Sequence, residues 1–469
     1  MTNVVVNAAA KTVTLTLTTP VLNNQTVLLN YTDVVGNTVN AIQDAAGNDA
    51  LGLTNQAVTN TTPNTDQIFN LTTNTDTFTG AAGNDTFNAT YDAGVSTDTF
   101  GFGGNDVLNG NGGIDTLHID HLIDVAITPS DALWTSISNI EKVVFNTTGN
   151  GAQTLTTGSN FDTAFSGGVN LTTATSGAGA IDITMISFTH SATITATSLA
   201  GAQTIQTGSG VSTVTATSGA GALNITGTGL TTVVASNTGD GAQNIGGFIG
   251  TGSVPNGGAS LTLVNATTSG LGAQTIISTS TSAVTVNVTS GNGAITVVTG
   301  SGNDAISLFA SSAAGANAIT AGAGADTINL YTDFSSVDTI TQANGDSIAM
   351  TANTTTNLIA AGQTITFGNS LDIVNGFAGA TDVLDVGTAG SAVSGISMNE
   401  AAFAANATIF LSGDYDAGTH IFTIAANGIG ASTLLLDTTA IDDQNITTAD
   451  TWVLLVGTNS NSLISSTFI

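Results

Sequence analysis

Short runs in which hydrophobic and polar residues alternate extend over most of the chain. Near the start they include Thr12–Leu17 and Thr26–Tyr31, and further on Gln203–Ile205, Leu223–Ile225 and Ala294–Val298. A period of two residues places successive side chains on opposite faces, which is typical of half-buried β-strands. The runs are rich in Thr, Val and Ile, and Gly, Asn and Asp separate them, as in strands and turns. The pattern therefore predicts an all-β protein.

A longer repeat is superimposed on these runs between residues 151 and 345. A Gly-Ala pair, usually within Ser/Thr-Gly-x-Gly-Ala, places Ala at 152, 180, 202, 222, 242, 273, 294 and 316, in steps of 28, 22, 20, 20, 31, 21 and 22 residues. A spacing of about 21 residues, with short strands and Gly turns, predicts a parallel β-solenoid whose rungs stack on one another. The longer steps would hold surface loops, such as 246–258. An antiparallel sandwich with coincidental spacing is the alternative.

Two segments carry helix signals. Pro129–Asp131 precedes a run of apolar residues that predicts a helix over Ala132–Ile140, with Trp134 packed against the core. The capping box Ser397–Glu400 predicts a short helix over Ala401–Ala405. The rest of 346–469 alternates again, and we expect strands at Thr408–Leu411, His420–Ile424, Thr433–Leu436 and Trp452–Val456.

The first 63 residues contain too few strand runs to close a sandwich of about seven strands. The sequences VNAAAKTVTLTL, VLLNYTD and NAIQDAAGNDA resemble the Ig-like repeats of large bacterial surface proteins, where such sequences form the second half of the domain. The resemblance implies a partial sandwich with an open sheet edge, and an open edge pairs with another strand. Three alternatives remain: the chain is cut from a longer one, the sandwich is completed from within, or a neighbouring subunit donates the missing strands.

Composition narrows the possible partners. The chain has 2 Lys, no Arg, 30 Asp and 2 Glu, a formal net charge of −30, and no Cys. It cannot neutralise phosphates, so nucleic acid and anionic membrane surfaces are excluded as partners, and disulfides are excluded as staples. No segment reaches the roughly 18 apolar residues of a membrane span, so membrane insertion is not expected.

The preference for Asp over Glu points to turns, where Asp bonds its own backbone. Asp-rich turns with almost no cations to pair with them favour a hard divalent metal. Calcium takes its oxygen ligands from such carboxylates and from backbone carbonyl groups. An acidic surface that only keeps the protein soluble is the alternative.

Five glycine-rich segments give these Asp residues a regular setting. They read GAAGNDTF from Gly80, GFGGNDVL from Gly101, GNGGIDTL from Gly110, GSGNDAI from Gly300 and GAGADTI from Gly322. Glycine lets the turn aim its carbonyl groups inward, the Asp adds a carboxylate, and the apolar residue two positions later begins a buried strand. One turn cannot supply the roughly six to eight oxygens that calcium takes, so two stacked turns would share an ion.

The candidate calcium ligands are the carboxylates, amides and carbonyl groups of these turns. In the first three turns they are Gly80, Ala82, Asn84, Asp85, Gly101, Gly103, Asn105, Asp106, Gly110, Gly112 and Asp115, with Asp98 as a ligand of an incomplete turn. In the two later turns they are Gly300, Gly302, Asp304, Gly322, Gly324 and Asp326. Asp382 and Asp385, in GFAGATDVLD, follow a drifted form of the pattern.

These turns resemble the calcium-binding nonapeptides of the RTX family, G-G-x-G-x-D-x-U-x with a large apolar U. With the Gly-Ala repeat and the acidic, Cys-free composition, most of 64–469 resembles the RTX-type surface-layer (S-layer) proteins of Gram-negative bacteria. The resemblance implies Ca²⁺ as cofactor, type I secretion with an uncleaved C-terminal signal, and an extracellular place on the cell surface. The tail Ser465–Ile469 is compatible with such a signal. The envelope-anchoring domain of such proteins is not recognisable here. Three alternatives follow: the domain was removed, another protein provides the anchor, or the subunits polymerise end to end through the partial Ig-like module.

Other chemistry is close to absent. The four His residues form no HExxH sequence, and no G-x-S-x-G elbow occurs. We therefore expect no enzyme but a calcium-dependent, self-assembling structural protein that forms an S-layer or a filament through β contacts between its own subunits. The alternative is a calcium-stabilised RTX adhesin that binds a glycan or a surface.

The expected organisation has five parts. They are a partial Ig-like module (1–63), an RTX-like calcium β-roll (64–120), a short helical connection (121–150), the β-solenoid (151–345) and a β-rich C-terminal cap with the secretion signal (346–469).

Overall fold

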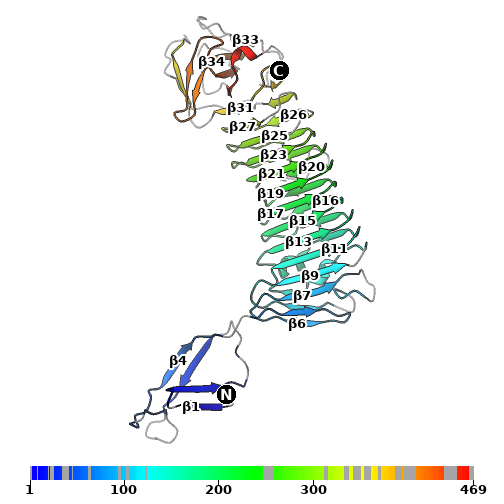
Figure 1. Cartoon of the computed structure of the whole chain (residues 1–469), viewed down its shortest axis with the longest axis vertical. Helices are drawn as coiled ribbons and strands as arrows, with labels where there is room; N and C mark the ends of the chain where they lie inside the picture. Colours follow the sequence, from blue (N-terminus) through cyan, green and yellow to red (C-terminus); the bar gives the residue numbers. More distant parts are fainter. Residues whose placement is uncertain are drawn as a thin grey trace.

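The protein forms a long column of stacked strands with a smaller group of strands at each end (Figure 1). This computed structural model describes residues 3–7, 9–18, 21, 26–33, 42–44, 46–61, 65–92, 97–101, 105–121, 124–246, 258–310, 315–331, 337–341, 350–352, 361–367, 371–385, 393–395, 408–437 and 451–463. Nearly all of its regular structure is β-strand, so the all-β fold class is confirmed.

One sheet, called the long sheet here, runs along the whole column. Its strands pair in parallel, each with the strand of the next rung. In order they are β5 (Ile68–Asn70), β7 (Thr86–Thr90), β9 (Thr116–His121), β11 (Lys142–Thr147), β13 (Val169–Thr175), β15 (Ala192–Ser198), β17 (Ser212–Ser218), β19 (Leu230–Asn237), β21 (Leu263–Thr268), β23 (Thr285–Ser290), β25 (Ala305–Ala310), β27 (Thr327–Tyr331) and β31 (Asp372–Asn375).

Two further parallel sheets complete the rungs. The second sheet contains β12 (Gln153–Thr156), β14 (Ile181–Thr184), β16 (Gln203–Thr207), β18 (Leu223–Gly227), β20 (Gln243–Gly246), β22 (Gln274–Ile277), β24 (Ile295–Val298), β26 (Asn317–Thr320), β28 (Asp338–Thr341) and β32 (Val383–Asp385). The third sheet, at the N-terminal end of the column, contains β6 (Thr77–Thr79), β8 (Val107–Asn109) and β10 (Ile137–Ser138). The parallel pairing confirms a solenoid and excludes the antiparallel sandwich.

The core lies between the sheets and follows from the alternation in the sequence. Ile194 and Val214 are fully buried and adjacent in the long sheet, and Ile205 and Ile225 occupy the equivalent positions in the second sheet. The intervening Thr and Asn side chains face outward. Each rung therefore buries an apolar stripe only when its neighbours stack on it.

The Gly-Ala turns stack so closely that they admit no side chain. A Cβ on Gly221 would collide with the carbonyl oxygen of Gly201 one rung earlier, and a Cβ on Gly201 would collide with that of Gly179. The Gln that follows several of these turns is buried, and its amide bridges the two sheets. Gln203 donates to the carbonyl oxygen of Thr217 at 2.7 Å.

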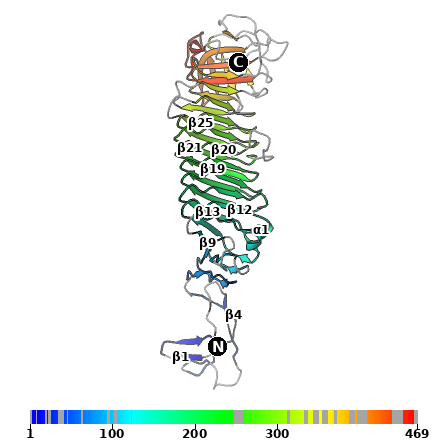
Figure 2. The same ribbon diagram turned by 90° about the vertical axis from the view of Figure 1, so that its right-hand side faces the viewer.

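The predicted helix over 132–140 is wrong. Only one 3₁₀ turn forms, η1 (Asp131–Trp134), and Ile137 then enters β10, where it pairs with Leu108. Trp134 is buried, as expected, because it packs in an aromatic cluster that holds the chain close to the column. That cluster includes the ring of Phe161 from α1 (Ser159–Ala164). The alternation did not predict this helix, which lies on the flank of the column (Figure 2). The helix predicted at 401–405 lies outside the described residues.

The N-terminal region forms two separate antiparallel ribbons. β1 (Asn3–Asn7) pairs with β2 (Thr12–Thr16), and β3 (Val27–Tyr31) pairs with β4 (Leu53–Val58). Within the described residues no strand pairing joins the two ribbons. Every residue of β1 and β4 is exposed, so apolar side chains of this region face solvent.

The C-terminal region folds as an antiparallel group against the last rungs. The strands predicted there are confirmed as β34 (Thr408–Asp416), β35 (Ile421–Ile424), β36 (Ser432–Asp437) and β37 (Thr451–Val456). β35 also pairs with β30 (Thr364–Phe367), which pairs with β29 (Met350–Ala352), and β34 pairs with β33 (Val393–Gly395). Because β37 pairs in parallel with β31, this group covers the final edge of the long sheet. None of the helices in the described part of the chain has the length and apolarity to cross a membrane.

Candidate metal-binding turns

The turns at 80–85 and 110–115 lie directly above one another in the column. Each leads from the third sheet into the long sheet, from β6 to β7 and from β8 to β9. The backbone N–H of Gly112 donates to the carbonyl oxygen of Ala81 at 3.2 Å, and that of Ile114 donates to Oδ1 of Asn84 at 2.8 Å. The structure thus brings together two of the predicted turns, which contain Gly80, Ala82, Asn84, Asp85, Gly110, Gly112 and Asp115.

Acidic side chains form a ladder where these turns enter the long sheet. The N–H of Asp85 donates to Oδ1 of Asp115 at 2.6 Å, and the N–H of Asp115 donates to Oε2 of Glu141 at 2.8 Å. Asp85 in turn accepts the N–H of Gln67 at 2.6 Å. Each carboxylate therefore binds the backbone of the rung before it, and both Asp side chains are buried.

The two Asp residues of this ladder differ in their second oxygen. Oδ2 of Asp85 accepts the N–H of Ala81 at 2.7 Å, so backbone donors satisfy both of its oxygens. Oδ2 of Asp115, whose side chain is 0 % exposed, has no hydrogen-bond partner among the described residues. A Cβ on Gly110 would collide with both this oxygen and the carbonyl oxygen of Asn139. Two oxygens that only accept thus crowd one side of Gly110, where a proton or a cation would relieve them.

The electrostatics of Asp115 lead to the same conclusion. Burial raises the pKa of this carboxyl to about 6, and the nearby charges of Asp85, Glu141 and Asp66 raise it further in the same direction. The cluster contains four acids, and no cation contributes to the shift. A divalent ion would compensate both the burial and the mutual repulsion of these carboxylates.

The predicted turn at 101–106 belongs to another corner of the rung. It leads into β8 of the third sheet, so it does not stack on the turns at 80–85 and 110–115. Asp106 accepts the N–H of Asp76 at 2.8 Å, and burial, with the charges of Asp76 and Asp98, raises the pKa of Asp106 to about 6. The predicted ligands Asp98, Gly101, Asn105 and Asp106 all lie here, whereas Gly103 is outside the described residues.

Asp98 and Asn105 already have partners in this corner. Oδ1 of Asp98 accepts the N–H of Phe100 at 2.8 Å, and the amide of Asn105 donates to the carbonyl oxygen of Ala132 at 2.9 Å. Gly101 has a positive φ of 132° and faces Leu133, so its place is in the packing of the turn.

The turns at 300–304 and 322–326 rebuild the same ladder near the other end of the column. They enter β25 and β27, and their acids occupy the position directly before a long-sheet strand, as Asp85 and Asp115 do. Asp304 accepts the N–H of Val284 at 2.8 Å, Asp326 that of Asp304 at 2.7 Å, and Asp372 that of Asp326 at 2.8 Å. Stacking also joins the glycines, since the N–H of Ala323 donates to the carbonyl oxygen of Gly300 at 3.0 Å.

Asp304 repeats the feature found at Asp115. Burial raises the pKa of Asp304, which is 2 % exposed, and its Oδ2 has no hydrogen-bond partner among the described residues. The Thr299 hydroxyl, which is close enough to lower this pKa in part, donates instead to the carbonyl oxygen of Ala321 at 2.6 Å.

A second ladder lies along the start of the second-sheet strands. Asn317 donates to Oδ1 of Asp338 at 2.7 Å, and Asp338 donates its N–H to Oδ1 of Asp382 at 3.3 Å. Asp382 also accepts the N–H of Ala378 at 2.6 Å, so backbone donors hold both of its oxygens. Asp385 stands at the end of β32 and is not part of this ladder.

Sequence reasoning missed three acids that the structure places in the ladders: Glu141, Asp338 and Asp372. None of them follows the glycine motif. The signal that identifies them is an acid directly before, or at the first position of, an alternating run.

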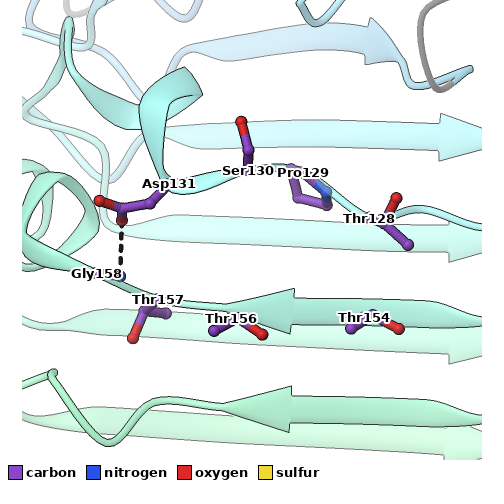
Figure 3. Close-up of a pocket in the computed structure, with 8 residues that line it drawn as sticks. All are labelled: Thr128, Pro129, Ser130, Asp131, Thr154, Thr156, Thr157 and Gly158. Carbon is purple, nitrogen blue, oxygen red and sulfur yellow. Dashed lines mark hydrogen bonds between the residues drawn. The ribbon is translucent and has the colours of Figure 1, made fainter.

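A shallow pocket of about 410 Å³ lies between the segment before η1 and the end of β12 (Figure 3). Five of its eight lining residues are Thr or Ser, but most of the surface that lines it is apolar. Asp131 is its acidic residue, but its carboxylate accepts the N–H groups of Gly158 at 2.7 Å and Phe161 at 3.1 Å and so caps α1. The arrangement explains how α1 is held and supplies no reactive group.

No group of three or more His, Cys, Asp or Glu side chains in the described residues is arranged to hold a metal ion by itself. Any ion at the ladders would therefore depend on backbone carbonyl oxygens as well.

Comparison with known proteins gives one partial match. Residues 1–35 match a sequence family described as a "putative flagellar system-associated repeat". No curated protein and no solved structure matches the chain significantly. The chain thus carries a flagellar system-associated type of repeat at its N-terminus, followed by a repetitive parallel β-solenoid.

Proposed function

We propose that this protein is a calcium-dependent, self-assembling extracellular structural protein that forms a surface layer or a filament. The observation that carries the proposal is the buried Oδ2 of Asp115, which has no hydrogen-bond donor in the described residues and shares one side of Gly110 with the carbonyl oxygen of Asn139. A cation or a proton would relieve such an oxygen pair in a ladder of acids.

Calcium fits this chemistry better than other ions. The available ligands are carboxylates, side-chain amides and backbone carbonyl groups, which are the hard oxygen ligands of calcium. The Asp115 turn and the Asp304 turn both belong to the glycine-rich segments that resemble RTX repeats. In calcium-poor surroundings the repelling acids would oppose folding, and calcium outside the cell would join the rungs.

Assembly is supported by the N-terminal ribbons. Their strands expose apolar side chains, including Val6 of β1 at 63 %, and their edges have no partner strands among the described residues. Strands from a neighbouring subunit would cover both the apolar side chains and the open edges. Heterologous contacts of this kind produce sheets or filaments unless the subunits close into a ring. The flagellar description of the matching family is compatible with a place outside the cell. We also propose a cell-envelope anchor as a partner.

Electron microscopy with calcium titration tests the proposal. We expect ordered sheets or filaments in millimolar calcium and their dissolution after chelation. Isothermal titration calorimetry on the calcium-free chain should detect calcium binding. Folded, dispersed particles under both conditions would contradict assembly, and an absence of binding heat would contradict the calcium sites.

A calcium-stabilised adhesin is the second candidate, and one observation favours it. Phe309 and Tyr331 are 40 % and 46 % exposed and stack in parallel on the outer face of the long sheet, with ring centroids 4.7 Å apart. Exposed aromatic rings beside neutral amides are suited to sugars. Glycan binding that is lost in Phe309→Ala and Tyr331→Ala, by chains that do not assemble, would favour this candidate.

A further inference from the structure

The charge of the chain is concentrated in the parts of the sequence before and after the middle of the column. Residues 163–303 contain only two acids, Asp182 and Asp240, and no Lys or Arg. The remaining 30 of the 32 acids precede or follow this segment. The middle of the column is therefore almost neutral in a protein whose formal net charge is −30.

Within this segment, the outward side chains of six long-sheet strands form one uninterrupted surface, called the neutral face here. These side chains lie in three parallel rows, each of which runs from β13 through β15, β17, β19 and β21 to β23. None of the rows contains a charged residue. The rows are Asn170, Thr193, Thr213, Thr232, Leu263 and Thr285; Thr172, Thr195, Thr215, Val234, Asn265 and Asn287; and Ala174, Thr197, Thr217, Ser236, Thr267 and Thr289.

The opposite side of the column differs in two respects. The exposed Asp182 interrupts the outer face of the second sheet, where it pairs with Thr204 of β16. The strands of that sheet are also shorter, for example four residues in β14 against seven in β15. The neutral face is therefore the broader and the uncharged one of the two.

Charge determines which surface a second copy can approach. Two chains with the same strong negative charge repel each other wherever acids face acids, and salt screens this repulsion only beyond about 10 Å at 0.1 M. The neutral face allows close contact without bringing carboxylates together. It also offers groups that bind in a dry contact: Thr methyl and hydroxyl groups, Asn amides, and apolar side chains such as Val234, which is exposed.

We propose that the neutral face is a lateral contact surface for a second copy of this chain, which joins columns side by side. The inference rests on the proposed self-assembly and adds the surface through which the columns associate. Calcium would assist the contact indirectly, because it neutralises the acids at the two ends of each column.

A pair of matched substitutions tests the surface. Thr215 in β17 and Thr275 in β22 are both half-buried, outward-facing Thr residues without a charged neighbour in register, but they lie on opposite faces. We expect Thr215→Asp to weaken self-association in calcium at least about tenfold, since it places a carboxylate in the contact. Thr275→Asp should associate like the original chain. Sedimentation velocity and electron microscopy measure both, with circular dichroism as the check on folding.

Single cysteine substitutions give a second measurement, which does not depend on whether the folded protein tolerates an Asp side chain at these positions. The chain has no cysteine, so a disulfide in Thr215→Cys can form only between two copies. Oxidation in calcium should cross-link Thr215→Cys into dimers much more than Thr275→Cys.

The outcomes separate the two proposals. If the original chain does not assemble in calcium, both the proposed function and this inference fail. If it assembles while Thr215→Asp assembles equally well, or the two cysteine variants cross-link equally, only the neutral face is wrong. Monomeric columns that bind a neutral polysaccharide through this face would also overturn the inference.

Discussion

At the scale of single residues, the carboxylates of the ladders have two different roles. Asp85 and Asp382 have both oxygens bound by backbone N–H groups, so these side chains close turns without help from an ion. Asp115 and Asp304 each keep one buried oxygen without a hydrogen bond from the described residues. The same residue type at the same place in the rung thus serves structure in one turn and, in our proposal, calcium in the next.

Asp115→Asn should therefore stabilise the protein in chelator, and calcium should cancel or reverse this gain relative to the original chain. In chelator, the new amide keeps an acceptor for the N–H of Asp85 and supplies a donor toward the carbonyl oxygen of Asn139, so we expect a gain of about 1–3 kcal/mol. In calcium the variant should lose the stabilisation of that site, about 2.7 kcal/mol at 100 times the Kd. Thermal unfolding measures both. Asp182→Asn, which removes an exposed acid outside the ladders, is the control, and equal shifts in both variants would contradict the site.

The pH dependence of the stability of the calcium-free protein follows from the raised pKa values. Those of Asp106 and Asp115 rise from 3.8 in the unfolded chain to about 6, so the folded state binds protons more tightly between these values. In chelator, the free energy of unfolding should increase as the pH falls from 7 toward 5. The contribution of these two carboxyl groups to stability should disappear as the pH rises through about 6.

Calcium should reverse this trend, because protons then compete with the ion for the same carboxylates. The midpoint of thermal unfolding at pH 7, 6 and 5, with and without chelator, tests this. If the unfolding midpoint in chelator instead decreases from pH 7 to pH 5, the buried acids do not dominate the pH dependence of stability.

At the scale of elements, turn spacing determines which rungs can stack. Gly221 illustrates the constraint, because a Cβ there would meet the carbonyl oxygen of Gly201. Gly167 has open space around its Cβ position and no positive φ. We expect Gly221→Ala to lower the free energy of unfolding by about 1–3 kcal/mol and Gly167→Ala to leave it unchanged or raise it slightly. Urea unfolding of both variants provides the measurement, and similar losses in both would refute the stacking argument.

The sequence predicts these elements well where each rung has the same length. The Gly-Ala spacing gives the solenoid, and the alternation gives strands such as β16, β18 and β24 close to their observed bounds. Prediction fails where the rungs lengthen. From β5 to β7 the register advances by 18 residues, whereas from β7 to β9 it advances by 30, so the turn at 101–106 moves to another corner.

The helix over 132–140 fails for a related reason. Its apolar spacing suits a helix, but the same side chains also fit a short strand once Trp134 packs against Phe100 and Phe161. That contact joins residues far apart in the sequence, so local periodicity contains no information about it.

At the scale of the whole molecule, acids occupy one position of the rung only near the ends of the column. Directly before the long-sheet strands, or at their first residue, stand Asp85, Asp115 and Glu141 at one end and Asp304, Asp326 and Asp372 at the other. Between them the register brings Val169, Ala192 and Ser212 to this position, which need no ion. In our proposal the column therefore has two zones that respond to calcium and a central zone that does not.

Chelation should consequently unfold the column from its ends. In hydrogen–deuterium exchange, we expect amides of β7, β9, β25 and β27 to lose protection when calcium is removed, while those of β15 to β21 stay protected. Neighbouring rungs support each other, so the boundary should lie within one or two rungs of Glu141 and of Val284. The apolar core of the centre, including Ile194, Val214 and Val233, is sufficient for its stability because it is fully buried there. Uniform loss of protection would mean that the column folds as one cooperative unit, and no loss would mean that backbone hydrogen bonds alone stabilise the ladders.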